Sequence, residues 1–168
     1  MDEDTDRHDP QGHRLLQLGV FLFLCALLVG IAIPRFAVPR LALATHLLGI
    51  TQGLFLIALG LIWPRLHLSA GLARVAFWSV VYGCVAAWFA NLLAAVWAAG
   101  NTLLPMAAGS ARGTAIQEGF VVVALRTGGA ALIVATALVL WGLRQTTGAT
   151  LAVRPPPQPQ ADKPEGAA

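Results

Sequence analysis

One histidine lies inside an apolar stretch of the chain, where an ionisable side chain is costly. His46 is followed by Gly49 and Gly53 at spacings of three and seven residues, so the three share one face of a helix. Gln52 flanks that face. A histidine beside glycines suits a flat cofactor, because the imidazole can ligate a metal while the missing side chains let a ring approach. One axial histidine is enough for haem, whereas zinc requires three or four ligands.

The same spacing has a second interpretation. Gly49 and Gly53 form a GxxxG pattern, and Gly60 extends it by seven residues. Such a pattern lets two membrane helices pack closely. His46 would then form a hydrogen bond across the helix interface. The spacing by itself leaves both interpretations open.

Two further polar residues, Tyr82 and Asn91, lie in the third apolar stretch. Asn91 is deep enough to need a hydrogen-bonding partner, either on another helix or on a substrate. Tyr82 is the only tyrosine, and its hydroxyl is a candidate proton donor. The alternative for Tyr82 is a core residue bonded to a backbone carbonyl. We therefore take Asn91, Gln52 and Tyr82 as candidates to orient a substrate or stabilise charge.

An arginine interrupts the fourth apolar stretch. Arg126 comes eight residues after Glu118. If the helix begins at Glu118, Arg126 lies inside the membrane and needs a partner. If the helix begins after Arg126, that side chain extends to the outer surface. Glu118 is expected at the outer interface, where a solvated carboxylate in the first helical turn is favoured by the helix dipole.

The elements that position these residues follow from the distribution of charge. The 168 residues are 57% apolar and 11% charged, with a mean hydropathy of +0.71. A soluble domain carries about 25% charged residues. The charges leave four apolar blocks, each long enough for a spanning helix of about 20 residues. No block alternates with period two, as a membrane barrel requires. The sequence predicts an all-α integral membrane four-helix bundle, with helices at about 14–33, 42–63, 73–98 and 117–143.

The two ends of the chain differ from the core in composition. Residues 1–13 are rich in acids and residues 145–168 are rich in proline, so both are expected to be disordered tails around a domain at 14–144. Seven basic residues fall on the side of the termini and three on the other, which places the termini in the cytoplasm. Arginines at the membrane interface account for the net charge of +3, so no nucleic-acid partner is implied.

Other common sites find no support in the sequence. Cys25 and Cys84 lie in apolar runs without CxxC spacing, so they predict neither a disulfide nor a zinc site. Walker, GxSxG and HExxH motifs are absent. The usual soluble hydrolase classes are therefore excluded.

Several strings resemble the hydroxylaminobenzene mutase family. They cover most of the chain from His46 to Arg144: HLLGITQGLFLIALGLIWPRLHLS (46–69), FWSVVYGCVAAWFANLLAAVWAAG (77–100), LLPMAAG (103–109), GTAIQE (113–118) and LWGLR (140–144). The LLVGIAIPRF ending of the first helix is also similar. The resemblance implies an isomerase of the bacterial inner membrane that converts hydroxylaminobenzene to 2-aminophenol within nitroarene degradation.

The pattern of His46, Gln52 and Gly53 also resembles the styrene oxide isomerases. Those proteins carry HxxxxxNG at the start of their second helix and use the histidine to ligate haem b in a trimer. The resemblance implies haem b on His46, a small aromatic hydroxylamine as substrate, and a homotrimer. This chain has Gln52 where that family has asparagine, and Asn91 falls near the family's catalytic tyrosine.

A non-catalytic membrane protein is the alternative class. A small transporter or structural subunit would use His46, Gln52, Asn91 and Arg126 for helix packing or for an ion path. Transporters often contain inverted repeats and broken helices. The chain shows no convincing repeat.

Overall fold

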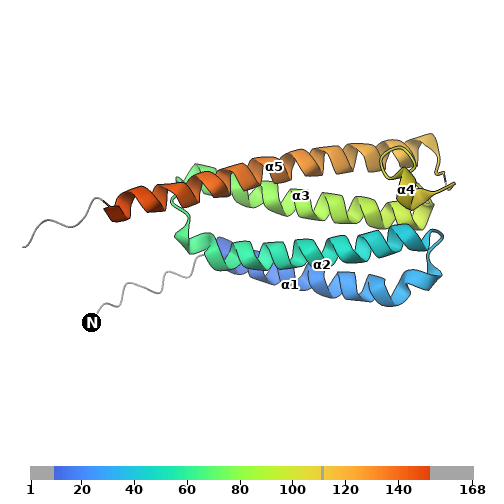
Figure 1. Ribbon diagram of the computed structural model, residues 1–168, viewed down its shortest axis with the longest axis horizontal. Coiled ribbons are helices and arrows are strands. Elements are labelled where there is room, and N and C mark those ends of the chain that lie inside the picture. The colour runs from blue at the N-terminus through green and yellow to red at the C-terminus, as the bar shows by residue number, and fades with distance from the viewer. Residues whose placement is uncertain (1–9, 111, 152–168) are drawn as a thin grey trace, which may run out of the picture.

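A computed structural model describes residues 10–110 and 112–151 of the chain. Four long helices run nearly antiparallel, and a very short helix caps one end (Figure 1). Their bounds are α1 Pro10–Ala32, α2 Pro39–Ile62, α3 Ala70–Trp97, α4 Pro105–Ala108 and α5 Ala115–Leu151. Short 3₁₀ turns, η1 Ile33–Arg35 and η2 Trp63–Arg65, follow α1 and α2.

All four long helices have the length and apolar composition to cross a membrane. Their candidate spans are Pro10–Arg35, Pro39–Arg65, Ala70–Trp97 and Ala115–Arg144. The prediction of an all-α fold with four apolar helices is therefore confirmed. The start of α1 and the end of α5 lie at the same end of the molecule, as an even number of crossings requires (Figure 1).

The helix bounds differ from the predicted ones mainly at the two ends of the domain. α1 begins at Pro10, inside the segment expected to be a tail, because proline fits the first position of a helix. α5 continues to Leu151, well past the expected end, because no proline interrupts the chain before Pro155. The remainder of the two predicted tails lies outside the described residues.

The helices associate as two close pairs, α1 with α2 and α3 with α5, and the pairs meet mainly through α2 and α3 (Figure 1). Glycines face glycines within each pair. A methyl group on Gly53 would lie 2.9 Å from the carbonyl oxygen of Gly19, and one on Gly83 would lie 2.9 Å from that of Gly128. The helix backbones therefore approach closely, as small residues permit in membrane helices.

Local hydrogen bonds define the start of two helices. Ser69 caps α3 by accepting a hydrogen bond from the Leu72 amide at 3.5 Å. Before α5, the Thr114 amide donates to Gln117 Oε1 at 2.8 Å, and the Gln117 amide donates to Thr114 Oγ1 at 3.4 Å. This reciprocal pair is a capping box. It explains why α5 begins before Glu118.

Candidate functional site

His46 lies between α1 and α2 with its ring oriented by a backbone carbonyl. Its Nδ1 is 2.7 Å from the carbonyl oxygen of Ala26. A carbonyl oxygen only accepts, so Nδ1 must donate, and in a neutral imidazole Nε2 then carries the lone pair. Metal-ligating histidines commonly donate their second ring nitrogen to a backbone carbonyl in this way. The ring is therefore held in the tautomer that a metal ligand or a general base requires.

The glycine that makes room for the His46 ring is Gly30, which the sequence analysis did not single out. A methyl group on Gly30 would lie 2.6 Å from both Cε1 and Nδ1 of His46. The missing side chain therefore lets the ring lie flat against α1. Its only sequence signal is its place in the LLVGIAIPRF string near the end of α1.

Gly49 and Gly53 do not leave open space for a cofactor ring beside His46. A methyl group on Gly49 would lie 2.5 Å from Trp88 Nε1 and 2.7 Å from the Ala26 Cβ. A methyl group on Gly53 would meet Gly19 and Phe23 of α1 within 3.0 Å. Within one chain these glycines serve helix packing, because protein atoms already fill the room that a porphyrin would need. This packing favours the second interpretation of the GxxxG pattern, and a role of Gly49 and Gly53 beside a cofactor stays a prediction.

Two buried polar atoms near this point have no hydrogen-bonding partner among the described residues. They are Gln52 Oε1 and Trp88 Nε1. Gln52 lies one helical turn after Gly49, and the indole of Trp88 packs on Gly49. A buried polar group without a partner costs about 1–3 kcal/mol, so its presence in the middle of a bundle calls for an explanation.

Asn91 is buried on α3, but it forms no hydrogen bond to another helix. Its Nδ2 donates to the carbonyl oxygen of Ala87, four residues earlier on the same helix, at 3.0 Å. Of the two alternatives for Asn91, the bond to another helix is not observed within the described residues. The Oδ1 atom has no partner within residues 10–110 and 112–151, so it remains free to accept a hydrogen bond from a ligand.

Tyr82 belongs to the other helix pair. Its hydroxyl is 2.8 Å from Thr127 Oγ1 on α5, and Thr127 in turn donates to the Val123 carbonyl at 2.8 Å. Tyr82 therefore donates to Thr127, and its side chain is half-exposed on the surface of the α3–α5 pair. The alternative of a core tyrosine bonded to a backbone carbonyl is therefore not the one observed, and a role as proton donor stays a prediction.

The Glu118 carboxylate accepts hydrogen bonds from the loop that precedes α5, whereas a solvated carboxylate was expected. Its Oε1 accepts from the amides of Gly100, Asn101 and Gly113 at 2.9, 3.2 and 3.4 Å. Its Oε2 accepts from the Thr102 amide at 3.2 Å and the Thr102 hydroxyl at 3.0 Å. We call these five residues the Glu118 cluster. It joins the chain after α3 to the start of α5.

Arg126 lies eleven residues after the start of α5 and points away from the rest of the chain. This spacing puts Arg126 roughly 16 Å along the helix axis from the start of α5, and its side chain is exposed. α5 thus begins before Glu118, so the alternative in which the helix starts after Arg126 does not apply. No ion pair joins Arg126 to any residue of the described segments.

The described segments contain no group of three or more His, Cys, Asp and Glu side chains that could hold a metal. A haem site needs no such group, because one histidine is enough, and His46 has the required side chain. Such a ligand leaves the other coordination positions to the cofactor itself.

Comparisons with known proteins identify the family of the chain. The profile of a family described as styrene oxide isomerase matches residues 11–144. Hydroxylaminobenzene mutase HabB of Ectopseudomonas oleovorans is 50% identical over 135 residues, which cover 80% of this chain and 82% of HabB. Hydroxylaminobenzene mutase HabA of the same organism is 42% identical over 104 residues, covering 62% of this chain and 77% of HabA. No solved structure matches the chain.

Proposed function

Because the chain belongs to the styrene oxide isomerase family, we propose that it is a membrane-embedded isomerase that rearranges hydroxylaminobenzene to 2-aminophenol. The two mutases to which it is similar support this substrate class. The structural observation that carries the proposal is His46, whose Nδ1 is held by the Ala26 carbonyl while Nε2 stays available. The non-catalytic alternative has no comparable support.

The reaction conserves atoms and electrons. The N–O bond of the hydroxylamine breaks, a C–O bond forms at the ortho carbon, and the ortho hydrogen leaves as a proton while the nitrogen gains one. Positive charge develops on the ring as the N–O bond weakens. An apolar pocket suppresses capture of that ring by bulk water.

We further propose that His46 holds haem b through Nε2. The tautomer of His46, with Nδ1 donating to the Ala26 carbonyl and Nε2 carrying a lone pair, fits a residue that would hold the iron. Ferric haem iron, when bound, supplies a Lewis acid for the hydroxylamine without net redox change. Gln52 Oε1 and Asn91 Oδ1, which lack partners, are the protein's acceptors for orienting an N–H or O–H group.

The first test is turnover. Purified protein in lipid nanodiscs should convert hydroxylaminobenzene to 2-aminophenol, with the product retaining the oxygen of ¹⁸O-labelled substrate. Full incorporation of oxygen from labelled water would overturn internal transfer. An absence of product would overturn the mutase proposal.

The second test concerns the cofactor. The visible spectrum of the purified protein should contain a Soret band that is lost in His46→Ala. The matched control is His67→Ala, because His67 is an exposed histidine in the connection between α2 and α3. Turnover by a protein without a Soret band, or a band unchanged in His46→Ala, would refute haem ligation and leave the mutase proposal standing.

We also propose that both termini are cytoplasmic in a bacterial inner membrane and that the chain forms a homotrimer. The excess of basic residues at the end with the termini supports the orientation. The resemblance to the styrene oxide isomerases, which form trimers, supports the homotrimer. Reporter fusions to the C-terminus and native mass spectrometry test the two statements separately.

A further inference from the structure

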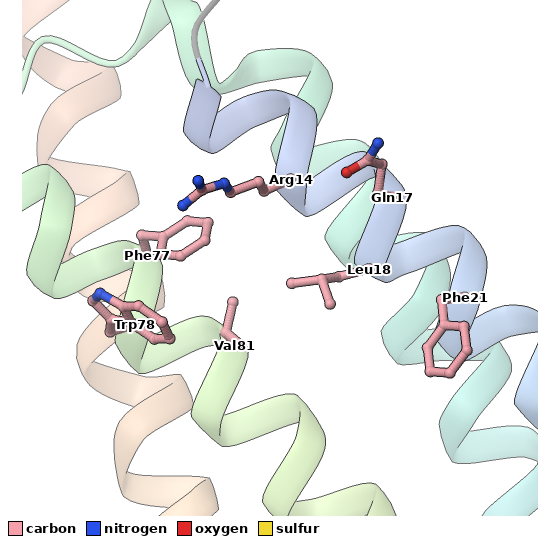
Figure 2. Close-up of a pocket in the computed structure, with 7 residues that line it drawn as sticks. All are labelled: Arg14, Gln17, Leu18, Phe21, Phe77, Trp78 and Val81. Carbon is pink, nitrogen blue, oxygen red and sulfur yellow. The ribbon is translucent and has the colours of Figure 1, made fainter.

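A groove lies between α1 and α3, with a polar mouth at the end where α1 begins. Its volume is about 460 Å³. Arg14 and Gln17 lie at the mouth, and the walls carry the aromatic rings of Phe21, Phe77 and Trp78. Figure 2 shows Arg14 extending from α1 towards Phe77 on α3, with Leu18 and Val81 facing each other beyond it. We call this feature the α1–α3 groove.

A smaller and more enclosed cavity adjoins the groove inside the bundle. Leu18, Phe21 and Val81 line both, so the two spaces are neighbours that share a wall. The inner cavity has a volume of about 130 Å³, and its deeper wall consists of Leu22, Cys25, Leu56, Val85 and Trp88. An apolar cavity of about 150 Å³ in another protein stays dry and binds benzene. The inner cavity therefore has the size and chemistry for one aromatic ring.

The deep end of the inner cavity adjoins the residues that hold His46. Trp88 forms part of its wall, and the indole Nε1 packs on Gly49, three residues after His46. Gly49 also packs on Ala26, whose carbonyl oxygen accepts the His46 Nδ1 hydrogen bond. The inner cavity thus adjoins, through Trp88, the turn of α2 that carries His46 and Gly49.

We propose that the α1–α3 groove and its inner cavity bind a neutral, single-ring aromatic amine or hydroxylamine. The identity of the ligand rests on the proposed function. The ring occupies the inner cavity, and the amine or hydroxylamine group faces the mouth with Arg14 and Gln17.

Binding of aniline tests the proposal without turnover, because aniline has no N–O bond to rearrange. In nanodiscs, Val81→Phe should weaken aniline binding at least tenfold, since Val81 lines both spaces. The matched control is Val96→Phe, at an exposed position of the same helix outside both linings, with an expected change under twofold. Equal affinity of wild type and Val81→Phe would overturn the proposal.

A second measurement uses the wild-type chain, so it does not depend on the folding of a variant. Cys25 lines the inner cavity, whereas the other cysteine, Cys84, is fully buried in the core. Aniline should slow the modification of Cys25 by N-phenylmaleimide at least fivefold, as read by peptide mass spectrometry. A rate that is unaffected by aniline but changes with the phospholipid composition of the nanodisc would assign the groove to lipid and overturn the proposal.

Different results would refute the groove proposal and the isomerase proposal. Turnover of hydroxylaminobenzene with an unchanged KM and unchanged aniline affinity in Val81→Phe would refute the groove while the isomerase stands. Aniline binding that is sensitive to Val81→Phe, in a protein without turnover, would support the groove and refute the isomerase.

Discussion

The Glu118 cluster and the residues around His46 use polar groups in opposite ways. In the Glu118 cluster, both carboxylate oxygens accept several hydrogen bonds from the loop before α5. Around His46, the ring is fixed by one bond to Ala26, while Gln52 Oε1 and Trp88 Nε1 have no partner in the described part of the chain. Both Glu118 oxygens already accept hydrogen bonds, whereas Gln52 Oε1 could still accept one and Trp88 Nε1 could still donate one.

The difference separates structural from chemical roles. Hydrogen bonds to a charged group contribute about 1.5–3 kcal/mol, so a saturated carboxylate stabilises the fold. Unpaired buried groups reduce stability and persist where a ligand supplies the missing partner. We therefore expect substitutions at Glu118 to affect stability most, and substitutions at Gln52 to affect it least.

The largest loss of stability is expected for Glu118→Gln. The substitution removes the negative charge and turns an NH₂ group towards donors such as the Thr102 amide, so we expect a loss of about 2–3 kcal/mol. An SDS titration of the purified protein in mixed micelles measures it. Gln117→Ala in the adjacent capping box should lose only about 1 kcal/mol. Equal losses for the two variants would contradict the special role of the Glu118 cluster.

A smaller loss of stability, with a larger effect on activity, is expected for Gly30→Ala. Its methyl group would overlap the His46 ring and displace Nδ1 from the Ala26 carbonyl. Forcing extra volume into a packed site costs about 1–3 kcal/mol. Turnover should fall at least tenfold.

The matched control for Gly30→Ala is Gly71→Ala, since a methyl group on Gly71 meets no atom within 4 Å. Turnover of the control should stay within twofold of wild type. If Gly30→Ala is as active as Gly71→Ala, the orientation of the His46 ring does not matter for the reaction.

Tyr82→Phe should lose less stability still. The half-exposed hydroxyl makes one hydrogen bond to Thr127, which is worth about 0.5–1 kcal/mol. Turnover should remain within twofold, because the hydroxyl is bonded to Thr127 on a half-exposed face of the α3–α5 pair. A tenfold fall in kcat with unchanged stability would place Tyr82 in the reaction after all.

The smallest stability change is expected for Gln52→Leu. Removing a buried oxygen that has no partner should leave the unfolding free energy within about 1 kcal/mol of wild type. Turnover should nevertheless decrease at least fivefold if Gln52 orients the substrate. A loss of more than 2 kcal/mol with unchanged turnover would instead assign Gln52 a purely structural role, similar to that of Glu118.

The amino-acid sequence by itself determined the four apolar helices, because their length and lack of charge leave no other arrangement for the backbone in a bilayer. It also identified His46 as an unusual intramembrane histidine. Helix ends were less predictable: the capping box at Thr114 and Gln117 starts α5 before Glu118, and Pro10 starts α1 early.

Only the tertiary structure decided what each polar residue contacts. Gly30, and not Gly49 or Gly53, accommodates the His46 ring, and the carbonyl of Ala26 selects its tautomer. Asn91 bonds to its own helix, and Glu118 gathers amides from a loop sixteen to eighteen residues away. Periodicity places a residue on a helix face, but partners across a helix interface depend on how two helices rotate and slide against each other. Close packing at glycine contacts sets that geometry, and no spacing within a single helix records it.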